Sequence, residues 1–149
     1  MSTRCQVQVI QEGMGSWEDK VTLYHHTDGY PEYMIPIINK AYNYKRKPLW
    51  KGDTDLSCGW EKGRAGKVAS LLCWADPIVF EPEEGHELHG DIEYYYKLYC
   101  VNSNRGTNAE LAKWEVEVFE CDFGKGLGDK PFIKRTPLEK LSEKYPERR

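Results

Sequence analysis

Residues 91–101 read Asp-Ile-Glu-Tyr-Tyr-Tyr-Lys-Leu-Tyr-Cys-Val and carry the clearest strand pattern in the chain. Apolar and more polar residues alternate along this stretch, which is the period of a strand with one buried face. One face is predicted to hold Ile92, Tyr94, Tyr96, Leu98 and Cys100. The other face is predicted to hold Glu93, Tyr95, Lys97 and Tyr99. We therefore expect this strand to be a principal element of the sheet.

Three further stretches show strand-like alternation, at residues 4–10, 21–26 and 113–121. Turn residues separate the first two stretches, and an Asn- and Gly-rich segment separates residues 91–101 from the last one. Both arrangements are typical of antiparallel hairpins. The short apolar run at residues 78–80 is also suited to an extra strand.

Two segments between the expected hairpins have apolar residues at helical spacing, at residues 34–45 and 64–75. Pro31 suits a first helical position. Pro36 has no backbone N–H, so the first helix is expected to begin near Met34 or to kink in its first turn. Residues 137–145 suit a short amphipathic helix or a frayed tail.

The order β-β-α-α-β-β predicts an α+β fold, with one antiparallel sheet of about four strands and two helices packed on one face. The 149 residues are predicted to form a single α+β domain, 1–149. Within this domain we expect a basic loop near residues 45–63 and a flexible C-terminal tail after about residue 122.

Composition limits the class of protein. Apolar residues make up 40% of the chain, which is enough for one core and too much for a disordered chain. The sequence has no apolar run long enough for a transmembrane helix and no apolar signal segment at its start, so we expect a cytoplasmic protein that does not bind membranes. The five cysteines are odd in number and widely spaced, which argues against a disulfide framework.

The charge is unevenly distributed along the chain. The formal net charge is −3, whereas a dedicated nucleic-acid binder is more often basic. Acidic residues dominate residues 76–93, and basic residues dominate residues 40–67 and 130–149. Such runs are typical of solvated loops and tails. The basic segments are also suited to an acidic partner or a phosphate backbone, which keeps nucleic-acid binding as a weaker expectation.

Two motifs contain all four histidines. Residues 25–32 read His-His-Thr-Asp-Gly-Tyr-Pro-Glu, and residues 86–94 read His-Glu-Leu-His-Gly-Asp-Ile-Glu-Tyr. Both motifs lie at the ends of expected elements, where functional residues are often held on a rigid scaffold. The candidate ligand-binding residues in these motifs are His26, Asp28, Tyr30, His89, Asp91 and Glu93.

The joint occurrence of the two motifs resembles a family of small uncharacterised prokaryotic, archaeal and phage proteins. The resemblance depends on the His-Thr-Asp-Gly-Tyr-Pro-Glu turn at residues 26–32 and the His-Gly-Asp-Ile-Glu-Tyr strand at residues 89–94. It extends over roughly residues 3–101. The resemblance implies a cytoplasmic α+β protein, but the function of the family is unknown, so it implies no activity and no cofactor.

The motifs suggest a metal site if they meet in space. Candidate metal ligands are His26, Asp28, His89 and Asp91, with Glu93 as a further carboxylate, because imidazole and carboxylate together suit zinc, manganese or iron. The favoured alternative is structural: Asp28 caps the helix, and the two histidines form hydrogen bonds with Asp28 or Asp91. No cofactor is predicted, and a divalent metal ion is the one alternative.

The leading functional hypothesis is a non-enzymatic accessory protein that binds a protein partner or a second copy of itself. It is favoured by the missing catalytic signature and by the aromatic strand. If one sheet face lacks helix cover, Tyr95, Tyr99 and Phe119 would form an exposed aromatic patch. Two alternatives remain open: a metal-assisted hydrolase or nuclease that uses the His/Asp/Glu cluster, and a nucleic-acid accessory factor that uses the basic loop and tail.

Overall fold

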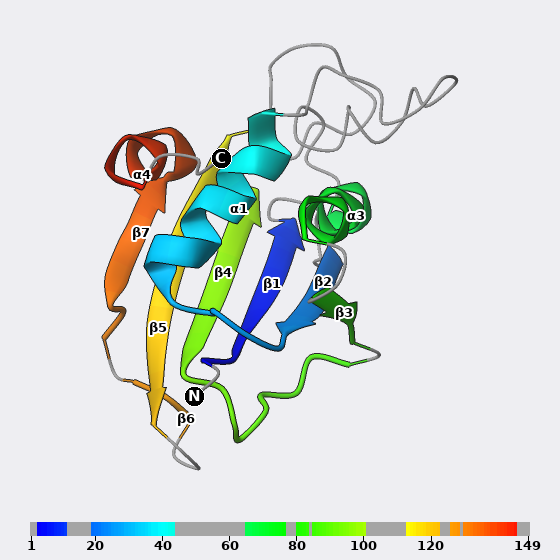
Figure 1. The fold of residues 1–149 in the computed structure, drawn as a ribbon, viewed down its shortest axis with the longest axis vertical. Helices are drawn as coiled ribbons and strands as arrows, with labels where there is room; N and C mark the ends of the chain where they lie inside the picture. The colour runs from blue at the N-terminus through cyan, green and yellow to red at the C-terminus, as the bar shows by residue number, and fades with distance from the viewer. Residues whose placement is uncertain are drawn as a thin grey trace.

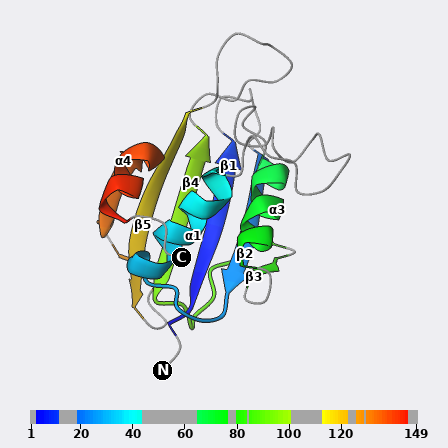
Figure 2. The same cartoon turned by 45° about the horizontal axis from the view of Figure 1, so that its top comes forward.

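A computed structural model of the chain describes residues 3–11, 19–43, 65–76, 80–83, 85–100, 113–122, 126–128 and 130–145. These residues form a seven-stranded mixed sheet and three helices that lie on one of its faces (Figure 1). The turned view shows the same arrangement, with the helices in front of the sheet (Figure 2). The predicted basic loop near residues 45–63 lies outside the described residues.

The strands follow one another in an order that differs from their order in the sheet. They are β1 (Cys5–Gln11), β2 (Asp19–His25), β3 (Phe80–Pro82), β4 (Tyr94–Cys100), β5 (Trp114–Asp122), β6 (Gly126–Leu127) and β7 (Ile133–Pro137). The helices are α1 (Pro31–Asn43), α3 (Ala65–Ala75) and α4 (Leu138–Lys144). The sheet order is β3-β2-β1-β4-β5-β6, and β7 also pairs with β5. Within the described part of the chain, every strand pairing is antiparallel except that of β1 with β4.

The α+β class is confirmed, but the predicted antiparallel sheet of about four strands with two helices is wrong. The two predicted hairpins join through parallel pairing of β1 and β4, with Cys5 opposite Tyr94 and Gln11 opposite Cys100. Alternation of side chains is the same in parallel and antiparallel strands, so the pattern could not distinguish them. The segment predicted as a tail contributes β6, β7 and α4 to the fold.

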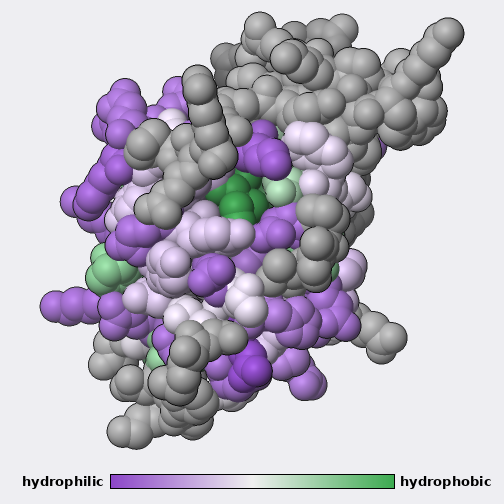
Figure 3. Space-filling model, viewed as in Figure 1, coloured by the Kyte–Doolittle hydropathy of each residue, from purple (hydrophilic) through white to green (hydrophobic). Residues whose placement is uncertain are grey.

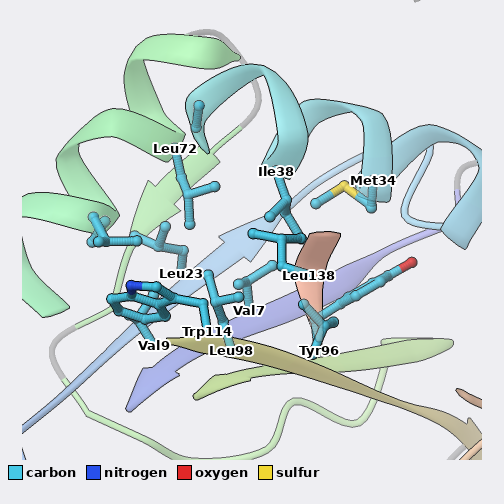
Figure 4. Close-up of a cluster of buried hydrophobic side chains, with 14 of the residues drawn as sticks. Val7, Val9, Leu23, Met34, Ile38, Leu72, Tyr96, Leu98, Trp114 and Leu138 are labelled. Carbon is cyan, nitrogen blue, oxygen red and sulfur yellow. The ribbon is translucent and has the colours of Figure 1, made fainter. Parts of the chain in front are cut away.

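The main core lies between the sheet and the helices. Val7, Leu23 and Leu98 of the sheet meet Ile38 of α1 and Leu72 of α3, and all five are buried (Figure 4). Each such side chain contributes on the order of 2 kcal/mol through its removal from water. The helices therefore cover this face of the sheet, which leaves the opposite face as the one that a partner could reach.

The helices begin largely where the residues predict. The backbone carbonyl of Tyr30 accepts hydrogen bonds from the N–H groups of Tyr33 and Met34, so α1 begins at Pro31 and accommodates Pro36 inside it. The N-terminus of α3 is capped from the sheet, because the N–H of Ala65 donates to Gln11 Oε1 at 2.9 Å. The amphipathic option for residues 137–145 is confirmed as α4, with Leu138 and Leu141 buried.

Residues 85–93 cross the face of the sheet opposite the helices. The side-chain amide of Gln6 donates to the carbonyl of Glu87 at 2.9 Å and accepts from the N–H of His89 at 3.0 Å. Gln6 is fully buried by this contact. The alternation of residues 4–10 predicts a half-buried strand, whereas β1 is buried on both faces, and this segment covers the second face at Gln6.

The strand predicted over residues 91–101 begins later, at Tyr94. Ile92 lies on the opposite face from the one predicted, where it is buried with Tyr24 and Tyr95. Glu93 links two strands through its backbone, since its N–H donates to the carbonyl of Arg4 and its carbonyl accepts from the N–H of Cys121, both at 2.8 Å. Ile92, two residues before β4, therefore lies on the opposite face from the one that unbroken strand alternation predicts.

The coloured surface on the helix side is mostly hydrophilic, with a strongly hydrophobic patch between α1 and α3 and smaller, weaker ones near the edges (Figure 3). The partly buried hydrophobic residues of these two helices include Ile37, Cys73 and Trp74. Among the described helices, none combines the length and apolar character needed to cross a bilayer. The cytoplasmic location stays a prediction.

The turn between β2 and α1 is packed tightly against the start of β1. Asp28 adopts a φ of 53°, which is uncommon for a residue other than glycine. The N–H of Gly29 donates to the carbonyl of Thr3, and its carbonyl accepts from the hydroxyl of Tyr96 at 2.6 Å. A Cβ added to Gly29 would lie 2.7 Å from the Cβ of Cys5. Only glycine fits here without displacing β1.

We predict that Gly29→Ala lowers the free energy of unfolding by about 2 kcal/mol, because the added methyl group displaces the backbone at Cys5. Urea denaturation measures the change. The control is Gly66→Ala in α3, where nothing lies within 4 Å of the added Cβ. That variant is expected to be neutral or to stabilise the helix by up to about 1 kcal/mol. Equal losses in the two variants would contradict the close packing at Gly29.

Candidate functional site

The two histidine motifs meet at Tyr24 of β2. The ring of His26, which follows β2, contacts the Tyr24 ring with centroids 4.6 Å apart. The ring of His89, in the 85–93 segment, contacts the same tyrosine with centroids 4.7 Å apart. Both motifs therefore contribute to one cluster, on the face of the sheet opposite the helices.

The Tyr24 hydroxyl connects the cluster to the second motif. It donates a hydrogen bond to Asp91 Oδ2 at 2.7 Å, and Arg4 lies 3.4 Å from the same oxygen. Burial raises the pKa of Tyr24 to about 12, and the hydrogen bond to Asp91 and the charge of its carboxylate add to the rise. The phenol is therefore neutral at pH 7 and acts as a donor to Asp91, which does not suit a nucleophile or a general base.

Each of the two histidines is paired with a glutamate at the edge of the sheet. His26 Nε2 lies 2.7 Å from Glu81 of β3, and His89 pairs through Nε2 with Glu83, just after β3. A carboxylate that orients an imidazole is a common part of general-base sites. The two imidazoles are 49% and 42% exposed, however, and exposed pairs of this kind contribute less than about 1 kcal/mol to stability.

Three of the predicted site residues do not join this cluster through their side chains. Asp28 is exposed at the turn before α1; burial and the charge of Asp76 raise the pKa of Tyr33 on the helix side, and the charge of Asp28 adds to the rise. Tyr30 contributes its carbonyl to the start of α1, and its ring lies 6.2 Å from that of Tyr33. Glu93 is held through its backbone, by Arg4 just before β1 and by Cys121 of β5.

The predicted metal ligands are therefore divided. His26, His89 and Asp91 each contact Tyr24, whereas Asp28 lies at the turn before α1. Among the described residues, no group of three or more His, Cys, Asp or Glu side chains is arranged to hold a metal ion. The partners of the two histidines are Glu81 and Glu83, and not Asp28 or Asp91 as the structural alternative expects.

A buried pair that the residue pattern did not indicate lies on the helix side. His25 is fully buried, and its Nε2 lies 2.9 Å from Oδ2 of Asp76, just after α3. The ring of Phe80 packs on His25 with centroids 4.6 Å apart. Asp76 also acts on Tyr33 of α1: the pKa of Tyr33 is raised, mainly by burial and then by the charge of Asp76. The sequence feature that could have indicated this burial is the alternation of residues 21–26, which places His25 on the same strand face as Leu23.

The second face of the sheet is divided into a covered half and an open half. Over β4, β5 and β7 it carries six side chains that we call the open face: Lys97, Tyr99, Glu115, Glu117, Phe119 and Arg135. The aromatic patch predicted for a face without helix cover is only partly present. Tyr99 and Phe119 are half-buried there, but Tyr95 is buried beside Tyr24 and Ile92.

A connected set of contacts orders the open face. Arg135 Nε lies 2.6 Å from Glu115 Oε1, and the guanidinium of Arg135 lies 3.9 Å from the ring centroid of Tyr99. The Tyr99 hydroxyl donates to Glu117 at 2.9 Å. Lys97 Nζ lies 5.3 Å from the ring centroid of Phe119, so both cations of the open face lie on aromatic rings.

Comparison with known proteins gives no relative, since no protein-family model, no curated protein and no solved structure matches the chain. The resemblance carried by residues 26–32 and 89–94 therefore stays a prediction. The arrangement of the side chains is the basis on which a function can be proposed.

We predict that Asp76→Ala lowers the free energy of unfolding by about 2 kcal/mol or more, because it leaves the buried His25 ring without its hydrogen-bond partner. Glu81→Ala is the matched control, since it also removes the carboxylate partner of a histidine. Because that pair is exposed, its loss should cost less than about 1 kcal/mol. Urea denaturation at neutral pH compares the two, and an equal cost would contradict a special role for burial at His25.

A second prediction concerns alkaline pH. The Tyr24 phenol ionises near pH 10 in the unfolded chain but only near pH 12 in the folded protein. The stability that it contributes is thus complete below pH 10 and is lost as the pH rises toward 12. The free energy of unfolding should fall over this range. In Tyr24→Phe the slope of this fall with pH should be smaller, by the contribution of one titrating proton per molecule. An unchanged slope would contradict the raised pKa.

Proposed function

We propose that this protein is a non-enzymatic interaction module and that the open face is its binding surface. The observation that carries the proposal is the ordered set of contacts from Glu115 through Arg135 and Tyr99 to Glu117 on a face without a described helix over it. The helices occupy the other face, where their packing closes the sheet. The open face is thus the part of the sheet that remains for a partner.

The contacts on the open face reduce the entropic cost of binding. Arg135 is held by an ion pair on one side and by an aromatic ring on the other, so little side-chain freedom remains to be lost when a partner binds. Arg135 nevertheless keeps 34% of its side chain exposed, and Glu115 keeps 29%. Tyrosine and arginine are also the residue types that most often dominate binding energy at protein interfaces.

The charge of the open face favours a protein partner over a nucleic acid. Its two cations, Lys97 and Arg135, are balanced by Glu115 and Glu117. A phosphate backbone would meet both glutamates, and a surface that binds it usually carries a clear excess of cations. The basic segment at residues 40–67, on which the nucleic-acid alternative depends, lies mainly outside the described residues.

The metal-assisted hydrolase has less support in the geometry. The two motifs do meet, but at a neutral tyrosine between two exposed histidine–glutamate pairs. A hydrolytic metal site needs three or four converging ligands. The four residues predicted as ligands are not arranged as a metal-binding group among the described residues: His26, His89 and Asp91 contact Tyr24, whereas Asp28 lies at the turn before α1.

We predict that the immobilised protein captures a partner from a lysate of its source, either another protein or an untagged copy of this chain, and that this capture depends on the open face. Arg135→Glu and Tyr99→Ala should each weaken capture by about tenfold or more, as expected of central interface residues. Mass spectrometry of the bound material measures the change.

The control for this experiment is Lys144→Glu, which makes the same change in charge as Arg135→Glu on α4, at the helix side of the sheet. It should retain capture. Circular dichroism shows whether each variant keeps the fold. Equal capture by all the variants, or no capture by the unaltered protein, would refute the open face as a binding surface.

A further inference from the structure

The charges of the open face follow a simple order across the strands. Both acidic residues, Glu115 and Glu117, lie on the middle strand β5. The cations lie on the two strands that flank it, with Lys97 on β4 and Arg135 on β7. Lys97 is directly opposite Glu117 in the β4–β5 pairing. A bulge places residues 134 and 135 of β7 beside the same part of β5.

This order makes the open face complementary to itself, but only in one orientation. If two copies stacked face to face with their strands aligned, β5 would lie over β5 and the glutamates would meet. If the strands crossed at about a right angle, the glutamates of each β5 would lie over the flanking cations of the other copy. A two-fold axis in the interface relates two such faces, as symmetric dimers require.

We infer that the open face binds a second copy of this chain, with the two sheets crossed at about a right angle. Glu115 and Glu117 of each copy then face Lys97 and Arg135 of the other. The ring of Tyr99, opposite Glu115, and the ring of Phe119, opposite Tyr95, lie on either side of the Lys97–Glu117 pair and add apolar contact there. This inference rests on the proposed function, since it names the partner of the same surface.

Pairing between sheet edges is a less favourable route to a dimer. The edge strand β7 contains Pro137 and a bulge, and the carbonyl of Lys134 already accepts a hydrogen bond from the hydroxyl of Thr136 at 2.6 Å. Of the other described edge strands, β3 has three residues, one of which is Pro82, and β6 has only two. Short strands, prolines and bulges are the usual protection of sheet edges against pairing. The sheet face is therefore the surface that we assign to the second copy.

Sedimentation equilibrium tests the inference. The mass should rise with concentration from 17.4 kDa toward twice that value. Glu115→Lys/Glu117→Lys and Lys97→Glu/Arg135→Glu each place four like charges on the face, and each should weaken dimerisation by about tenfold or more. A mixture of these two variants should dimerise again, because one face is then basic and the other acidic. Lys97→Arg, which keeps the charge order, should dimerise like the unaltered protein.

Carbodiimide cross-linking, which joins lysine to glutamate without a spacer, tests the crossed orientation. In an equal mixture of ¹⁴N- and ¹⁵N-labelled protein, links between copies carry both labels. The inference expects mixed-label links from Lys97 to Glu115 or Glu117. Mixed-label links only between other surfaces would overturn the orientation even if the protein dimerises.

A mass of 17.4 kDa at every concentration would overturn the inference. The proposed function would survive that result if the chain still captured a different protein and lost it in Arg135→Glu. Both proposals would fail if capture did not depend on Arg135 and if both charge-reversal variants dimerised as strongly as the unaltered chain. The two proposals are therefore separable.

Discussion

The side-chain amide of Gln6 is the interaction on which the second face of the sheet depends. Gln6 is the second residue of β1 and is fully buried, and its side-chain amide donates to the backbone of residue 87 and accepts from the backbone of residue 89. A buried amide without partners would cost on the order of 1–3 kcal/mol for each unsatisfied group. The 85–93 segment and Gln6 therefore need each other, because each satisfies polar groups that the other buries.

This contact explains why the second face has two halves. Over β1 and β2 the 85–93 segment covers Thr22 and Tyr24 and places His89 and Asp91 against the sheet. Over β4, β5 and β7 the face keeps half-exposed aromatic and charged residues. The covered half explains the histidine motifs as parts of a structural contact. The open half is the surface to which we assign binding.

Several features could be predicted because they depend on local periodicity. The alternation of β4 and β5, the helical spacing of α3 and the two leucines of α4 all follow from residues close together in the chain. The two histidine motifs do meet in space, at Tyr24, as a shared site would require. The partners of the histidines were not predictable, because Glu81 and Glu83 reach them through the pairing of β3 with β2.

By itself the sequence determined the α+β class and the positions of most strands and helices. Only the tertiary structure decided that β1 and β4 are parallel, that Ile92 and Tyr95 lie in the covered half, and that Tyr99 and Arg135 meet on the open face. The physical reason is that side-chain alternation reports which residues share a face of one strand. It contains no information on which strands become neighbours, or on which segment covers the face that they form.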